Sequence, residues 1–183
     1  MSETLTTPGY NIEPLTRDIA EQYVHELTAL ANQIPEVTYT PEDILADKKA
    51  DRQLLNKWSH SLIVFDGDKP AAFIMGYERA AEGGVQYPRN TLYISELAVG
   101  ESHQRQGLAR NLLKQFLERN IQTGFQSLSG DLNFSLQTNS APWNEHVINL
   151  YKSFGFKQRA TKEYTNRTDI ILGADLSEIT EAQ

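Results

Sequence analysis

The stretch from residue 91 to residue 117 constrains the fold more than any other part of the chain. Residues 91–99, TLYISELAV, are rich in β-forming residues and predict a strand. A short polar loop over residues 100–106 follows and ends at Gly107. Apolar residues then recur at helical spacing from Leu108 to Leu117, which predicts an amphipathic helix. The fold therefore has to combine a sheet with helices.

The predicted helix start at Gly107 has the features of a phosphate site. Backbone N–H groups in the first turn of a helix have no partner within it, and they point outward at the positive end of the helix dipole. Phosphate groups bind there for that reason. Gly107 allows close approach to the backbone, and Arg105 and Arg110 add positive charge. A plain strand-to-helix turn that needs a small residue shows the same pattern, so both interpretations stay open. The loop matches neither a Walker loop nor the Gly-x-Gly-x-x-Gly pattern.

The other periodicities predict a sheet with helices inserted between its strands. A helix over residues 18–33 is expected to begin at Asp18, with Glu21 as its capping-box partner. A weaker helix follows Thr40 and Pro41. The remaining helices are expected at 108–124 and 140–154, and the strands at 10–15, 61–65, 71–77, 91–99, 131–138, 158–164 and 169–172. The order β-α-α-β-β-β-α-β-α-β-β indicates a mixed α/β, or α+β, domain over residues 1–175 with a polar tail at 176–183.

Composition removes several classes of protein. The 183 residues fit one domain and carry a net charge of −7, whereas a nucleic-acid binder needs a basic footprint. With no cysteine, disulfides, thiolate metal sites and a cysteine nucleophile are excluded. The start of the chain is polar and acidic, unlike a signal peptide, and no apolar run approaches the about 20 residues of a membrane span. We expect a cytoplasmic protein that binds neither membrane nor metal.

Two motifs resemble those of the GNAT N-acetyltransferase superfamily. The run Gln104-Arg105-Gln106-Gly107-Leu108-Ala109 is similar to the family's Arg/Gln-x-x-Gly-x-Gly/Ala motif. The second motif is Asn-x-x-Ala-x-x-Leu-Tyr-x-x-x-Gly-Phe, which Asn144, Val147, Leu150, Tyr151, Gly155 and Phe156 match with valine in place of the alanine. The resemblance spans about residues 93–156. The first 57 residues fit only loosely.

The resemblance implies that the chain binds acetyl-CoA. Family members have a mostly antiparallel mixed sheet and hold the cofactor in a cleft where the fourth and fifth strands splay apart. By resemblance, backbone groups around Leu97, Ala98 and Val99 pair with the pantetheine arm, and Asn144 contacts the cofactor near its thioester. The pyrophosphate is then expected at the amides and side chains of Gln104, Arg105, Gln106, Gly107, Leu108, Ala109 and Arg110.

The resemblance also implies roles in catalysis. Tyr151 is expected to protonate the leaving thiolate, and a backbone N–H near Val99 to stabilise the oxyanion. Glu96, a carboxylate in an apolar strand, is the candidate base. Each residue has an alternative: Tyr151 as a core aromatic, Glu96 as one side of a salt bridge, Asn144 as a helix cap. Gln137 stands about where some members carry a glutamate instead.

The acceptor amine cannot be read from the sequence. In this family it is set by segments that correspond to residues 33–57, 80–90 and 161–167. Acidic residues in the first two of these segments mildly favour a cationic amine: Glu36, Glu42, Asp43, Glu78 and Glu82. The loop from Thr138 to Trp143 looks longer than in ribosomal-protein acetyltransferases, and Trp143 either flanks the acceptor or holds the loop.

Some features are expected to have no part in catalysis. His103 and His146 are predicted as surface histidines, and Gly155 as no more than a helix C-cap. Dimers are common in the family, which leaves a homodimer open. A CoA-binding sensor or regulatory module without catalysis is the alternative function.

Overall fold

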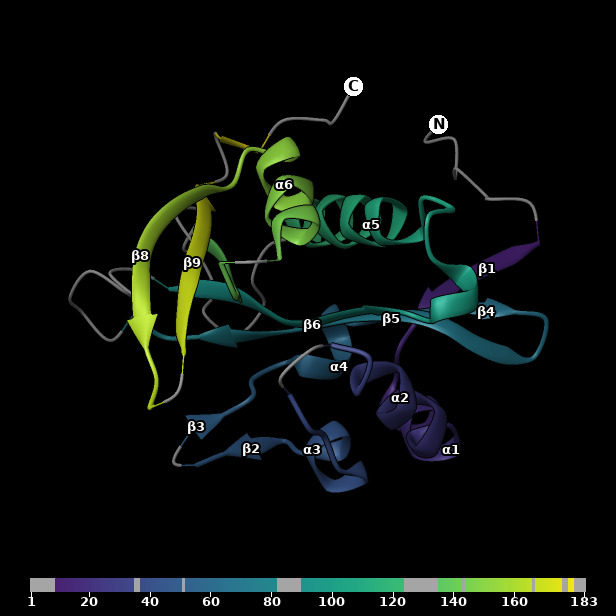
Figure 1. Ribbon diagram of the computed structural model, residues 1–183. Helices are drawn as coiled ribbons and strands as arrows, with labels where there is room; N and C mark the ends of the chain where they lie inside the picture. Colours follow the sequence, from purple (N-terminus) through teal and green to yellow (C-terminus); the bar gives the residue numbers. More distant parts are fainter. Residues whose placement is uncertain are drawn as a thin grey trace. The chain divides into compact units, whose positions relative to one another are not determined.

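The computed structural model describes residues 9–34, 37–50, 52–81, 90–123, 135–142, 144–165, 167–175 and 178–179 (Figure 1). The chain divides into two units, Met1–Tyr77 with Glu96–Asn120, and Glu78–Ser95 with Ile121–Gln183. The division passes through two strands, β5 (Lys69–Arg79) and β6 (Thr91–Val99). Neither unit is therefore a single continuous stretch of sequence.

The hairpin of β4 (Leu62–Asp66) and β5 is the centre of the first unit. Its strands pair antiparallel, and β1 (Tyr10–Pro14) pairs antiparallel with the other edge of β4, so the order is β1-β4-β5-β6. The apolar runs 62–65 and 71–75 are buried along their whole length. Because side chains alternate along a strand, burial at every position means that both faces of the hairpin are covered.

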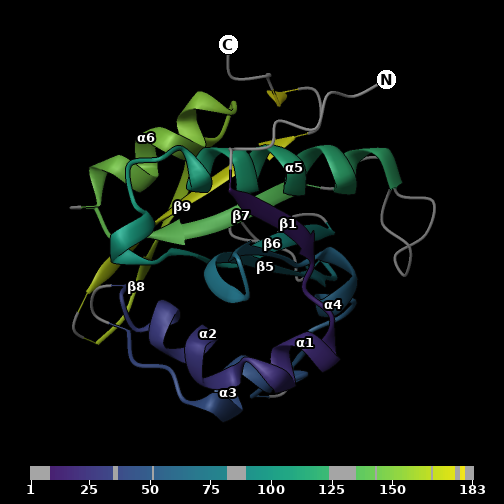
Figure 2. The ribbon, with the colours of Figure 1, turned by 90° about the vertical axis from the view of Figure 1, so that its right-hand side faces the viewer.

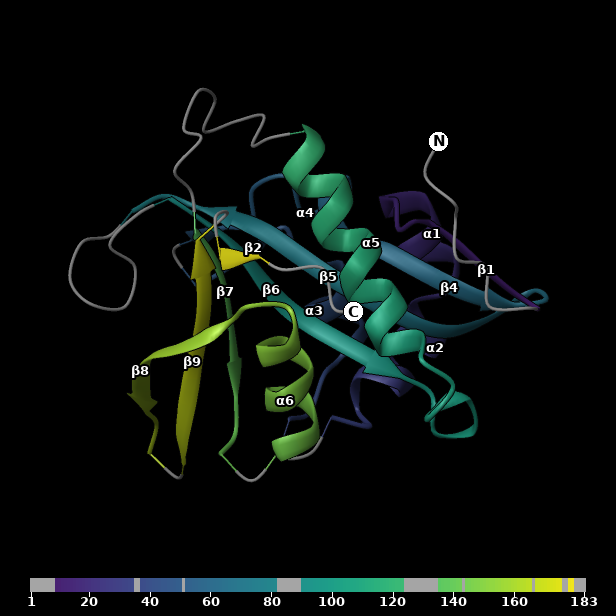
Figure 3. The ribbon, with the colours of Figure 1, turned by 90° about the horizontal axis from the view of Figure 1, so that it is seen from above.

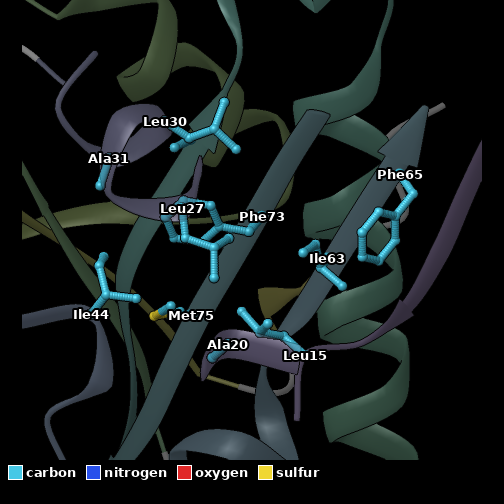
Figure 4. Packing of buried hydrophobic residues seen from close by; sticks show 11 residues of the cluster. Leu15, Ala20, Leu27, Leu30, Ala31, Ile44, Ile63, Phe65, Phe73 and Met75 are labelled. Carbon is cyan, nitrogen blue, oxygen red and sulfur yellow. The ribbon is translucent and has the colours of Figure 1, made fainter. Parts of the chain in front are cut away.

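Helices cover the hairpin on both faces, as Figure 2 shows. On one side lie α1 (Arg17–Gln22), α2 (Val24–Ala31) and α3 (Pro41–Leu45), and on the other lies α5 (Leu108–Thr123). Figure 4 shows how Ile63, Phe65, Phe73 and Met75 of the strands meet the first three helices. Leu27 is one of the helix residues in this cluster.

Short elements connect α3 to the hairpin. A two-stranded ribbon of β2 (Lys48–Lys49) and β3 (Arg52–Gln53) is followed by α4 (Lys57–His60). The sequence pattern did not predict them, because two-residue strands and a one-turn helix are too short to show a hydrophobic period. They place Lys57 and His60 in buried positions.

The second unit has the strand order β6-β7-β9-β8. β7 (Ser135–Ser140) runs parallel to β6, and β9 (Thr168–Asp175) is antiparallel both to β7 and to β8 (Lys157–Glu163). The sheet is thus mixed and mostly antiparallel, as predicted. Figures 1 and 3 show α6 (Glu145–Ser153) on one face of these strands.

Several predicted boundaries were wrong for local reasons. Thr16, not Asp18, caps the first helix, with its Oγ1 accepting from the amide of Ile19. The helix predicted over 18–33 breaks at Tyr23, which separates α1 from α2. The helix predicted from residue 140 begins only at Glu145, because β7 continues to Ser140. The predicted capping of α3 is confirmed: Thr40 and Asp43 form a capping box, with Pro41 in the first turn.

Gly155 does more than end α6. Its φ of 93° is the left-handed conformation expected of a C-cap. A Cβ at this position would also lie 1.8 Å from the carbonyl oxygen of Glu178. The prediction that capping is its whole role was therefore wrong, because the chain near Glu178 passes directly over this glycine.

Glu178 is anchored by three groups of the second unit. Lys157 Nζ donates to Oε1 at 2.7 Å, the amide of Asp175 donates to Oε2 at 2.9 Å, and the guanidinium of Arg159 also pairs with Oε2. These contacts, with the Lys157 hydrogen bond the largest cause, lower the pKa of Glu178 to about 2. The segment that carries Glu178 is thereby tied to β8 and β9.

Glu178→Gln should therefore destabilise the protein in a pH-dependent way. Since the folded-state pKa is depressed, the carboxylate's contribution is fully present above the unfolded pKa near 4.5 and is lost as pH falls towards 2. We expect a loss of about 1 kcal/mol at pH 7, as for partly exposed charged networks. Urea unfolding of both proteins between pH 3 and pH 7 measures it. A stability difference that stays constant over this range would contradict the assignment.

Candidate active site

The loop between β6 and α5 adopts a tight backbone conformation. After Gly100 the chain forms the one-turn helix η1 (Glu101–His103), and Arg105 and Gly107 then take positive φ values of 61° and 80°. The carbonyl of Gly107 accepts the amide of Asn111 at 3.0 Å, so α5 begins directly after this glycine. The first-turn amides of a 16-residue helix therefore open towards the loop.

The space beside Gly107 is open, while the space beside Gly100 is filled. A Cβ at Gly107 would meet no atom within 4 Å. At Gly100 it would meet Leu30, the carbonyl of Ala71 and His103, all at 3.1–3.2 Å. Gly100 thus packs the loop onto the protein, and Gly107 leaves the helix start accessible to a ligand, as phosphate binding requires.

The side chains of the loop divide into two groups. Gln104 Nε2 donates to the carbonyl of Val99 at 3.1 Å, and Gln106 Nε2 to that of Ser102 at 3.3 Å, so both glutamines hold the loop itself. Leu108 points into the core, which leaves only its amide for a ligand. Ala109 is half-buried, and Arg105 and Arg110 are exposed. The structure thus places the two glutamine side chains on the backbone of the loop and the two arginines at its surface.

The end of β6 holds the candidate base. Glu96, Leu97 and Val99 are half-buried, and Ala98 is buried. The charge of Glu96 acts on Lys57 of α4, a residue 39 positions earlier in the chain. The sequence offered a salt bridge to an arginine or a position at the rim as alternatives for Glu96; the structure adds its interaction with the charge of a lysine.

Lys57 is a buried cation that sequence reasoning missed. Only 3% of it is exposed, and its Nζ donates to the carbonyls of Ile44 at 2.7 Å and Ala46 at 2.8 Å, at the end of α3. The ring of Trp58 lies 4.6 Å from the nitrogen. Burial lowers the pKa of Lys57, while Glu96 and Asp47 act to raise it. No local pattern marks such a residue, since a lysine in a polar segment is usually on the surface.

Asn144 and Tyr151 both belong to α6, in the second unit. Asn144 is the N-cap residue by position, yet its side chain makes no capping hydrogen bond. Tyr151 is 2% exposed, and its ring packs edge-to-face on Phe156 with centroids 5.2 Å apart. Gln137 on β7 is also buried. The connection from β7 to α6 lies between Ser140 and Glu145, and Trp143 within it lies outside the described residues.

The parallel pairing of β6 with β7 stops before either strand ends. The last paired residues are Ile94 and Thr138, and Thr138 Oγ1 donates to the carbonyl of Ile94 at 3.0 Å. β6 continues to Val99 and β7 to Ser140. These are the fourth and fifth strands of the predicted order.

Other predicted surface features changed. Glu78, counted among the acidic surface residues, is fully buried. His103 is no surface residue, because Tyr10 contacts its ring and its side chain is 20% exposed. Glu36 and Glu82 lie outside the described residues. Across the described part of the chain, no group of His, Asp or Glu could hold a metal, and no helix could cross a membrane.

Lys57→Met should destabilise the protein strongly. The substitution keeps most of the side chain but leaves the carbonyls of Ile44 and Ala46 without their donor in a buried environment, which costs about 2–4 kcal/mol. Urea unfolding measures the loss. Lys48→Met, at an exposed position on β2, is the matched control and should change stability by less than about 0.5 kcal/mol. Equal effects of the two substitutions would show that Lys57 is not the anchor of α3.

Comparison with known proteins agrees with the motifs. Residues 22–156 match the family described as the acetyltransferase (GNAT) family. A thialysine N-epsilon-acetyltransferase from Caenorhabditis elegans is 27% identical over 166 residues, 88% of this chain and 92% of the relative. Among solved structures, Ard1 from Thermoplasma volcanium has a TM-score of 0.69 at 17% identity, covering 94% of this chain and 99% of its own.

A further solved structure contains the expected cofactor. The yncA protein of Salmonella typhimurium, bound to acetyl-CoA, has a TM-score of 0.64 at 17% identity, covering 96% of this chain and 98% of its own. At such identities these structures show a common fold. The family match covers most of the chain and crosses both motifs. The chain belongs to the acetyltransferase (GNAT) family and is an acetyl-CoA-dependent N-acetyltransferase.

Proposed function

We propose that this enzyme transfers the acetyl group of acetyl-CoA directly to a primary amine while both substrates are bound. The observation that carries the proposal is the loop before α5, where Gly107 opens the helix start and two arginines flank it. The complete absence of cysteine supports direct transfer, because a cysteinyl-acetyl intermediate has no residue to form on.

In this proposal the loop binds the pyrophosphate of the cofactor. The amides of residues 105–110 donate to phosphate oxygens at the positive end of α5, and Arg105 and Arg110 add charge. Backbone groups of Leu97 to Val99 pair with the pantetheine arm. The side-chain amide of Asn144, which makes no capping hydrogen bond, then contacts the cofactor near its thioester.

The chemistry requires one proton to leave the amine and one to reach the thiolate. Free alkyl amines have a pKa near 10.4, so Glu96 accepts a proton to give a neutral nucleophile. The nitrogen then attacks the thioester carbonyl, and a backbone N–H near Val99 stabilises the oxyanion. As the tetrahedral intermediate collapses, the C–S bond breaks and Tyr151 donates its proton to the departing sulfur. The attacking nitrogen then loses its excess proton, which returns through solvent to the Tyr151 oxygen and leaves a neutral amide.

The relatives guide the choice of acceptor. The C. elegans relative, whose name specifies an N-epsilon amine, matches over nearly the whole chain, including the region before residue 57. A lysine-like primary amine on a small molecule is therefore the first acceptor class to test. Peptide amines form the second class, since a solved structure with the same fold is the ribosomal-protein-S18-alanine N-acetyltransferase from Escherichia coli.

Gly107→Glu should abolish binding of acetyl-CoA. The new side chain projects into the open space at the helix start and places negative charge beside the pyrophosphate. Gly67→Glu is a matched control, because Gly67 also has a positive φ, 58°, and no atom within 4 Å of a Cβ. Isothermal titration should show at least a hundredfold loss of affinity for the first variant and less than twofold for the second. Unchanged affinity of Gly107→Glu would contradict the pyrophosphate site.

Tyr151→Phe should lower kcat about 10²–10⁴-fold at pH 7 with little change in acetyl-CoA affinity. The deficit should shrink towards pH 9–10, because a thiol with pKa near 8.5 leaves as a thiolate without an acid. Steady-state rates of thiol release across this pH range measure it. Tyr23→Phe, which keeps the ring against Phe65, is the control. Full turnover of Tyr151→Phe at every pH would show that Tyr151 is not the acid.

A further inference from the structure

A chain of hydrogen bonds joins the cofactor loop, residues 100–107 between β6 and α5, to β1. Tyr10 Oη lies 2.9 Å from Nδ1 of His103 and donates to Oε1 of Gln106 at 3.1 Å. The rings of Tyr10 and His103 meet edge-to-face with centroids 5.7 Å apart. Asp66, in the turn between β4 and β5, has its Oδ2 3.9 Å from the same nitrogen. Neither Tyr10 nor Asp66 has a part in the mechanism above.

The direction of these bonds follows from the number of protons. Gln106 Nε2 donates to the carbonyl of Ser102, so its Oε1 faces Tyr10 as an acceptor. The hydroxyl has one proton and gives it to that oxygen, so it must accept from His103. Nδ1 of His103 is therefore the ring nitrogen that carries a proton. The order is His103 to Tyr10 to Gln106.

The loop needs support of this kind. Arg105 holds a positive φ of 61°, a conformation that is unfavourable for a residue with a Cβ. Such a conformation persists only where the surroundings impose it. The hydrogen-bond chain holds the loop at His103 and Gln106, on either side of Arg105, and it joins those points to β1, which is itself paired with β4.

We propose that Tyr10 and His103 are positioning residues for acetyl-CoA, which hold the loop in the conformation that presents its amides to the pyrophosphate. This inference rests on the proposed function of the loop. A loop held in the bound conformation beforehand loses less conformational entropy when the ligand arrives, so the effect of the hydrogen-bond chain belongs to cofactor affinity. Once acetyl-CoA is bound, the reacting groups are unaffected.

Tyr10→Phe and His103→Leu each break the chain of hydrogen bonds while keeping an apolar body in place. Each should raise the Kd for acetyl-CoA about three- to tenfold, the range expected for one to two neutral hydrogen bonds, and leave kcat at saturating acetyl-CoA unchanged. His103→Asn should bring the Kd back to within about twofold of the wild type, because the asparagine Nδ2 supplies a donor near the position of Nδ1. Tyr23→Phe is the control for loss of a tyrosine hydroxyl. Isothermal titration, saturation kinetics and thermal unfolding of the apo proteins give the three readouts.

The outcomes separate this inference from the function on which it rests. Normal acetyl-CoA affinity in Tyr10→Phe, with Gly107→Glu unable to bind, would overturn the positioning role and leave the pyrophosphate site intact. Normal affinity in both variants would overturn the site itself. A purely structural role predicts a lower Tm with unchanged Kd, or no difference between His103→Leu and His103→Asn, and either result would also overturn the positioning role.

Discussion

The hairpin of β4 and β5 carries apolar side chains on both of its faces. Exposing either face to water is unfavourable. Each large side chain that it buries contributes about 1.5–3 kcal/mol, so helices have to cover both sides. One side is covered by α1, α2 and α3, and the other by α5. Since α5 must lie on the hairpin and β6 must pair beside it, the few residues between them are forced into a short, tight loop. The backbone conformation at Arg105 and Gly107 is a consequence of that packing.

Polar groups in the first unit repeatedly tie distant segments together where backbone atoms would otherwise lack partners. Lys57 donates hydrogen bonds to the carbonyls of Ile44 and Ala46 at the end of α3. The charge of Glu96 also acts on it. Lys57 therefore interacts both with residues of the segment 33–57, which was predicted to influence the choice of acceptor, and with the candidate base Glu96. Tyr10 and His103 do the same for the cofactor loop. In both cases a side chain outside the recognised motifs supports the residues inside them.

Prediction from sequence worked best where the signal was local and long. The strand Thr91–Val99 and the 16-residue helix after Gly107 were found within a residue or two, because a sustained hydrophobic period leaves little ambiguity. Prediction failed where a helix boundary or the burial of a charge depends on a single residue. Thr16 and Asp18 are both good N-caps, and only the backbone path after β1 selects Thr16. Glu78 looked like a surface charge, but it lies in the part of β5 that is buried, from Ala71 to Arg79.

The sequence by itself determined the family, the order of the main elements and the residues of both motifs, because these depend on neighbours within a few positions along the chain. Only the tertiary structure decided what surrounds those residues. Tyr10 and His103 are 93 positions apart, a Cβ at Gly155 would meet the carbonyl of Glu178, and Lys57 of α4 interacts with the charge of Glu96 on β6. Hydrogen bonds and charges act over a few ångströms in space whatever the separation in sequence, so such pairs leave no pattern along the chain.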